Sequence, residues 1–181
     1  MMNEKYIIRG VELMLDGFGV DRKDPNYADT PRRVAKLYKE LFTPPHNNMA
    51  VFPEKHDNMI ILRGHEAVGV CPHHLLPVRF KVWLGYVPDK HVLGLSKLGR
   101  IIHDQLTGPV LQEAFTEQIA DAMQKQLAPR GVAVVVSGAH GCMQLRGLHT
   151  QADVVTSSMR GVFLLNPPAR EEFLRLVGRI Q

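Results

Sequence analysis

The stretch "VRFKVWLGYVP", residues 78–88, gives the clearest indication of the fold because its apolar side chains recur at alternate positions. A period of two is typical of a β-strand with one buried face. The residues that set this period are Val78, Phe80, Val82 and Leu84. A second β-rich run, "MIILRG", occupies residues 59–64. The gap between the runs is short, which favours antiparallel pairing and predicts the first two strands of a sheet.

Helical periodicity follows this pair of strands. The runs at 94–106 and 109–127 each place apolar residues three or four positions apart and predict two successive helices. Residues 131–147 and 152–165 return to β-rich sequence, and 168–180 predicts a closing helix. The order of a strand pair, two helices and another strand pair favours a two-layer α+β sheet. Such a sheet has edges that oligomerisation could cover.

The N-terminal part predicts a helical extension. Residues 6–15 have helical spacing, and a second helix begins with Thr30 as its expected N-cap. Residues 43–58 carry three prolines and no periodicity, which indicates a linker. We therefore expect a helical extension and linker over 1–57 and a catalytic domain over 58–181.

Composition limits the class of protein. Of 181 residues, 45% are hydrophobic and 22% are charged, which is ordinary for a soluble globular protein. No apolar run approaches the roughly 18 residues that would span a membrane, and "MMNEKYIIRGVELML" lacks a secretory cleavage site. We expect a cytoplasmic protein without a membrane partner. A net charge of +4 without a dense basic block gives little support for nucleic-acid binding and suits a small anionic substrate.

Both cysteines of the chain lie beside histidines. Cys71 and His74 are three positions apart in "GVCPHHLLP", and Cys142 lies in "AHGCM". Three such ligands with one open position are typical of a catalytic Zn²⁺ site, and His73 or His140 could supply a fourth ligand. The alternative is two ordinary buried cysteines with histidines in nearby loops.

Other polar residues are less specific signals. Lys97 and Arg100 lie one turn apart at a predicted helix start, where they could bind phosphate or simply be solvated. Glu113 could be a surface carboxylate of an amphipathic helix. Arg146 follows Cys142 by four residues, so on an extended segment both would point to the same side.

Several motifs taken together resemble one known family. "DTPRRVAKLYKELF", "CPHHLLP", "GYVPDKHVLGLSKLGRII", "LQEAFTEQIADAM", "GVAVVVSGAHGCMQLRG" and "VTSSMRGVF" resemble GTP cyclohydrolase I in order and nearly in spacing, from about Thr30 to the C-terminus. The resemblance implies a T-fold (tunnelling-fold) subunit. Such a subunit has a ββααββ antiparallel sheet with helices on one face and an N-terminal helical extension. It also implies a homodecamer with active sites between subunits.

The implied reaction hydrolyses GTP at C8, releases formate and rearranges the product to 7,8-dihydroneopterin triphosphate. Carried over to this sequence, the family's zinc ligands are Cys71, His74 and Cys142. The resemblance gives His140 the proton transfers at the purine imidazole ring and His73 a part in opening the ribose. It gives Ser96 a part in the later ribose rearrangement.

The resemblance also assigns the contacts with the nucleotide. Glu113, with the preceding Gln112, matches the position that reads the guanine edge, where a carboxylate accepts paired hydrogen bonds. Four cations match the triphosphate contacts, the last of them supplied by a neighbouring subunit: Lys97, Arg100, Arg146 and Arg33.

The chain departs from the family pattern at three places. Pro72 replaces a usual Glu, Gly108 stands where an Arg is usual, and "QADVV" at 151–155 replaces a Ser-x-Thr run. These departures leave two alternatives open. One is a T-fold paralogue that acts on another purine nucleotide or stops at a ring-opened intermediate. The other is a non-catalytic GTP-binding subunit.

Overall fold

The computed structural model describes residues 2–44 and 50–178. The chain divides into two compact units, Met1–Thr43 and Pro44–Gln181. The segment expected to be a linker is partly ordered in the second unit, because strand β1 (Val51–Pro53) pairs with strand β4 (His91–Leu93) in a small antiparallel sheet. The other part of that expectation, over 45–49, lies outside the described residues.

The first unit is a pair of packed helices. Helix α1 (Glu4–Gly17) begins after Asn3, whose side chain accepts hydrogen bonds from the first backbone N–H groups. Helix α2 (Thr30–Phe42) has Asp29 at its N-cap, so Thr30 is its first residue and not the cap that we predicted. Two helices of this size are held mainly by the side chains between them.

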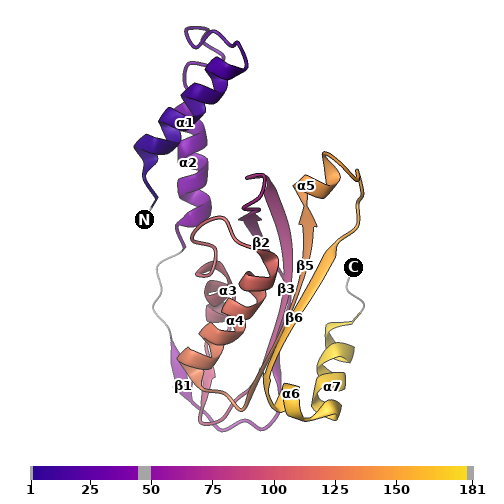
Figure 1. Cartoon of the computed structure of the whole chain (residues 1–181). Helices are drawn as coiled ribbons and strands as arrows, with labels where there is room; N and C mark the ends of the chain where they lie inside the picture. Colours follow the sequence, from indigo (N-terminus) through magenta and orange to yellow (C-terminus); the bar gives the residue numbers. More distant parts are fainter. Residues whose placement is uncertain (1, 45–49, 179–181) are drawn as a thin grey trace. The chain divides into compact units, whose positions relative to one another are not determined.

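The second unit contains the sheet that the alternating stretch predicts. Its four strands are β2 (Ile60–Val70), β3 (Pro77–Val87), β5 (Gly131–His140) and β6 (Val154–Gly161). They lie in the order β2-β3-β5-β6, and every neighbouring pair is antiparallel (Figure 1). The ββααββ order is thereby confirmed.

Helices α3 (Leu95–His103) and α4 (Gln112–Leu127) cover one face of this sheet (Figure 1). The alternate residues of β3 point toward them, and each is at most 2% exposed: Val78, Phe80, Val82 and Leu84. They share one core with side chains of both helices, including Leu98, Ile101, Phe115, Ile119 and Met123. Burying a side chain of this size stabilises the fold by about 1.5–3 kcal/mol. The predicted antiparallel sheet with two helices packed on one face is confirmed.

The opposite face of the sheet is covered in part by the C-terminal helices α6 (Val162–Leu165) and α7 (Pro167–Val177). Phe163 and Phe173 pack there against Trp83 in a second core. The closing helix was predicted, but we expected helices on one face only, and α7 lies on the face opposite α3 and α4. Strand β5 is buried on both faces, which explains why its sequence is a continuous apolar run and does not alternate.

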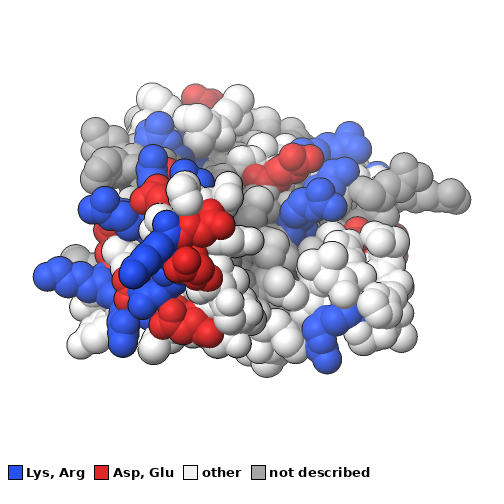
Figure 2. Space-filling view, turned by 90° about the horizontal axis from the view of Figure 1, so that it is seen from above, with Lys and Arg blue, Asp and Glu red and all other residues white. Residues whose placement is uncertain are grey.

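Two surface features bear on partners. Among the described residues, no helix has the length and apolar character needed to cross a membrane. The face seen in Figure 2 carries Lys and Arg side chains interspersed with Asp and Glu.

Candidate functional site

A tight turn between β2 and β3 presents the first cysteine. Cys71 N donates to Leu76 O, and Leu75 N donates to Cys71 O, both at 2.9 Å. Leu75 adopts a left-handed conformation, with φ 54°, which lets the chain reverse direction. Neither hydrogen bond uses position 72. Pro72, which has no N–H, therefore fits this turn without removing either bond.

The second cysteine follows the end of β5. Residues Gly141–Gln144 form the short helix α5, so our expectation of an extended segment through Arg146 is wrong. The register of β5 with β3 still brings α5 close to the turn between β2 and β3, because His140 pairs with Val78 near the start of β3. A Cβ at Gly141 would lie 2.9 Å from Pro77 O, so the two segments approach closely at a glycine.

The structure gathers two thiols and one imidazole at this end of the sheet. The Sγ atoms of Cys71 and Cys142 and one ring nitrogen of His140 lie within 4.8 Å of one another. Both cysteines are free. Burial raises the pKa of the Cys142 thiol, the neighbouring Cys71 raises it further, and Arg146 opposes the rise. A bound divalent cation would favour the thiolates, and sulfur and imidazole donors suit zinc.

His74 is placed differently from our prediction. Its side chain is exposed, and its Nε2 accepts a hydrogen bond from Arg146 Nη1 at 2.8 Å. The structure therefore groups His140 with the two thiols and leaves His74 beside the guanidinium. The predicted ligand set of Cys71, His74 and Cys142 stays a prediction.

A cavity of about 160 Å³ opens at the thiols. The residues that line it include Cys71, His73, Glu113, His140 and Cys142. The Nδ1 atom of His73 lies 3.7 Å from Cys71 Sγ. Glu113 is exposed in the first turn of α4, where the positive end of the helix dipole favours a carboxylate. Thiols, imidazoles and a carboxylate therefore face one small cavity.

The Gln112 amide is not free to read a base. Gln112 lies at the cavity wall but is only 2% exposed, and its Nε2 donates to backbone oxygens of β5 and β6. Its Oε1 faces His140 Nε2 at 2.8 Å. Sequence reasoning missed this contact, because no periodicity shows that residues 112 and 140 meet.

Burial also acts on His140. It lowers the pKa of the imidazole, and the carboxylate of Glu113 partly offsets that effect. The neutral ring is therefore favoured near pH 7, and a neutral ring has one nitrogen that can accept a proton or a metal ion.

The remaining predicted residues lie elsewhere in the described structure. Ser96, Lys97 and Arg100 are on α3 and are not among the described residues that line this cavity. Arg33 belongs to the first unit, where its Nε pairs with Asp29 at 3.1 Å. The structure thus brings together the thiols, His73, His140 and Glu113, but not the predicted phosphate contacts of α3.

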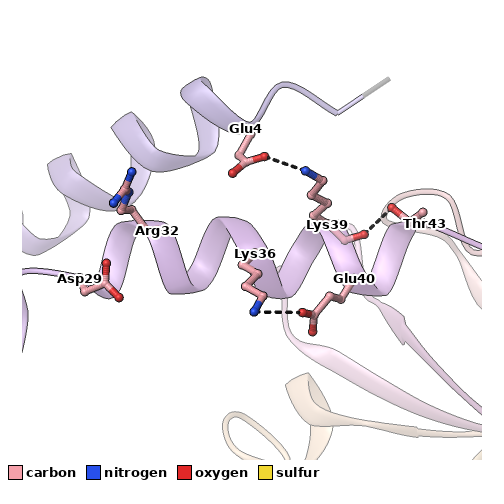
Figure 3. Close-up of a pocket in the computed structure, with 7 residues that line it drawn as sticks. All are labelled: Glu4, Asp29, Arg32, Lys36, Lys39, Glu40 and Thr43. Atoms are coloured by element: carbon pink, nitrogen blue, oxygen red, sulfur yellow. Dashed lines mark hydrogen bonds and ion pairs between the residues drawn. The ribbon is translucent and has the colours of Figure 1, made fainter.

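A larger hollow in the first unit has a different character. It measures about 830 Å³ and is lined by charged side chains of both signs (Figure 3). Lys39 pairs with Glu4 at 3.3 Å and Lys36 with Glu40 at 3.8 Å. These pairs are exposed, so they contribute little and indicate a solvated surface.

Comparison with known proteins identifies the family. The family model for GTP cyclohydrolase I matches residues 7–178. The protein named GTP cyclohydrolase 1 from Sulfurihydrogenibium sp. is 38% identical over 181 residues, covering 98% of this chain and 97% of that protein. Its namesake from Aquifex aeolicus is 39% identical, with 97% of each chain covered. The one from Drosophila melanogaster is 42% identical over 94% of this chain and 55% of its own length. The chain therefore belongs to the GTP cyclohydrolase I family.

Proposed function

We propose that this protein hydrolyses GTP at C8, releases formate and forms 7,8-dihydroneopterin triphosphate. One observation carries the proposal: in a chain of this family, two thiols far apart in the sequence meet at one cavity with His140 and Glu113. This combination offers metal ligands, a proton carrier and a hydrogen-bond acceptor for a purine edge.

The proposed cofactor is one Zn²⁺ ion held by Cys71, His74 and Cys142. The thiols fit, since both are free and lie close together, whereas the imidazole grouped with them is that of His140 and His74 lies beside Arg146. When bound, Zn²⁺ would supply Lewis acidity that activates the attacking water. His140 is the competing third ligand, because the structure groups it with the thiols.

The side chains around the metal would handle the purine and the ribose. The Glu113 carboxylate, exposed at the cavity, would accept hydrogen bonds from the guanine N–H groups. His140 would exchange protons at the purine imidazole ring, which suits a neutral imidazole. His73 would assist ribose opening, and Ser96 would take part in the rearrangement.

The triphosphate would be bound by Lys97, Arg100, Arg146 and Arg33, with neighbouring subunits of a homodecamer completing each site. Two observations support an oligomer. A cavity of about 160 Å³ is smaller than the 300–1,000 Å³ usual for small-molecule sites. Strands β2 and β6 are each paired on one side alone within the described sheet, which leaves two edges for other chains to cover.

We also propose a cytoplasmic location. Two free cysteines that lie close together support this proposal, because thiols persist without pairing in a reducing compartment.

The test is a product assay with metal content measured on the same sample. Zinc-loaded protein incubated with GTP should release formate and give a pterin that fluoresces after oxidation, with the mass of dihydroneopterin triphosphate. Fully loaded protein that yields neither product would reject the proposal. A ring-opened formamide without pterin would support the paralogue alternative instead.

A further inference from the structure

The Gln112 side chain ties the first residue of α4 to the two strands beneath it. Its Nε2 donates to Val136 O at 3.1 Å and to Val154 O at 2.8 Å. Val136 lies within β5 and Val154 is the first residue of β6. The amide is therefore held by the backbone of two paired strands.

These partners fix which way the amide points. A backbone oxygen only accepts hydrogen bonds, so the atom that faces Val136 and Val154 must be the amide nitrogen. The reverse orientation would place Oε1 against two carbonyl oxygens in a buried position. The assignment of nitrogen and oxygen thus follows from the hydrogen bonds themselves.

The neighbouring hydroxyls lead to the same orientation. Thr116 Oγ1 donates its one proton to Gln112 O at 2.8 Å. The proton in its 2.6 Å contact with Thr156 Oγ1 must therefore come from Thr156. Thr156 Oγ1 then has no proton left and accepts from Gln112 Nε2 at 3.2 Å. The amide nitrogen faces a third acceptor.

The amide oxygen is left facing His140. Gln112 Oε1 lies 2.8 Å from His140 Nε2 and carries no proton, so Nε2 must be the protonated ring nitrogen. In a neutral imidazole the other nitrogen, Nδ1, is then unprotonated. We propose that Gln112 is a positioning residue that fixes the tautomer of His140, so that Nδ1 is the ring atom able to accept a proton or a metal ion.

Gly138 leaves room for this contact. A Cβ built at Gly138 would collide with Gln112 Oε1 and lie 3.2 Å from His140 Nε2. Gly138 pairs with Val154 across β5 and β6, so its position is fixed by the same strands that hold the amide. A side chain at 138 would displace the oxygen that orients the ring.

The role differs from reading guanine. The N–H groups of Gln112 are taken up by protein acceptors, whereas the exposed Glu113 carboxylate is available to a purine. Gln112 therefore acts on catalysis through His140, and its loss should lower kcat more than it changes KM. This kinetic consequence rests on the proposed function, but the tautomer of His140 does not.

The direct test is ¹⁵N NMR of the histidine rings in zinc-free wild-type protein. His140 is assigned as the signal missing from His140→Gln among the nine histidines of the chain. We expect one tautomer, protonated at Nε2. A ring protonated at Nδ1, or an even mixture of both tautomers, would overturn the proposal even if the protein never turned over GTP.

The first variant is Gln112→Met, which keeps a long unbranched side chain and removes the amide. The His140 signals should shift toward the average of two tautomers. The kcat for GTP should fall by about 10- to 100-fold while KM changes by less than about two-fold. Glu113→Gln should instead raise KM. The assignment is contradicted if Gln112→Met keeps a single His140 tautomer. It is also contradicted if the variant mainly raises KM and weakens the preference for GTP over inosine triphosphate.

The second variant is Gly138→Ala, which displaces Gln112 Oε1 without touching the amide chemistry. We expect the same mixing of tautomers and a smaller loss of kcat. The matched control is Gly10→Ala, because a Cβ at Gly10 in α1 meets nothing within 4 Å. If the His140 tautomer populations are the same in Gly138→Ala, Gly10→Ala and wild type, the role of Gln112 is contradicted.

Discussion

His140 and His65 lie in the same sheet, and burial lowers the pKa of both imidazoles. Their partners differ. His140 meets the amide oxygen of Gln112, whereas the Nε2 of His65 lies 3.1 Å from the Nε2 of His103 at the end of α3. An amide whose nitrogen donates to backbone oxygens has only one possible orientation, so its oxygen must accept from the histidine. In a pair of imidazoles, either ring can be the donor.

The partner of each histidine determines what its ring can do. A ring with a fixed partner presents one chosen nitrogen, which suits proton transfer. A pair of rings joins β2 to α3 only while at most one ring is charged, because two imidazolium ions repel each other. Glu66 on β2 partly offsets the lowering of the His65 pKa, and on the α3 side Asp104 interacts with the charges of His103 and Arg100. The first histidine is suited to chemistry and the second to holding α3 in place.

The largest expected effect is the loss of zinc from the region around His140, with no counterpart expected in the region around His65. Cys142→Ala should lose the bound zinc and lower GTP turnover to background, because it removes one of two neighbouring thiols. Metal analysis and the formate assay on one sample measure both. His103→Gln is the control, and it should keep its zinc. Full zinc in Cys142→Ala would show that the thiols are not the metal site.

The next effect tests which histidine binds the metal. We expect His140→Ala to keep zinc and to lose about 10²- to 10⁴-fold in turnover, the range for removal of a general acid or base. His74→Ala should lose the zinc itself. The exposed His91→Ala controls for the substitution and should change neither. Zinc lost in His140→Ala and kept in His74→Ala would transfer the ligand role to His140.

The His65–His103 pair should make stability depend on pH. Burial, and to a lesser degree His103, lower the pKa of His65 from its ordinary 6.5, so the unfolded chain binds more protons below about pH 6.5. The free energy of unfolding should therefore fall as pH drops through and below that value. Denaturant titrations of His103→Gln should show a weaker fall, since glutamine can bond His65 without a charge. An unchanged pH slope in His103→Gln would remove the pair from the explanation.

The smallest effect concerns the packing of His65. A Cβ at Gly99 of α3 would lie 2.8 Å from His65 Cε1. Replacing a helical glycine by alanine usually stabilises by about 0.5–1 kcal/mol. We expect Gly10→Ala in α1 to show that gain, and Gly99→Ala to show none or a small loss. Equal gains at both positions, measured by thermal unfolding, would mean that the His65 ring moves without cost.

Much of the fold could be predicted because it depends on local periodicity. The alternation at Val78, Phe80 and Val82 identified a strand with one buried face, and that face is buried against α3 and α4. The face of the sheet on which α7 packs could not be predicted, because β5 is apolar at successive positions and a helix could cover either of its faces. Strand β1 was missed because three residues are too few to show a period.

Sequence patterns predict the order of strands and helices, the available metal ligands and hydrogen-bonding groups and, through the motifs, the family. Which atoms meet depends on the three-dimensional packing. It placed His140 with the two thiols, turned His74 toward Arg146, and buried Gln112 against two strands. Periodicity reports burial along one segment only. A hydrogen bond between Gln112 and His140 instead depends on the register of β5 with β3 and β6 and on where α4 begins.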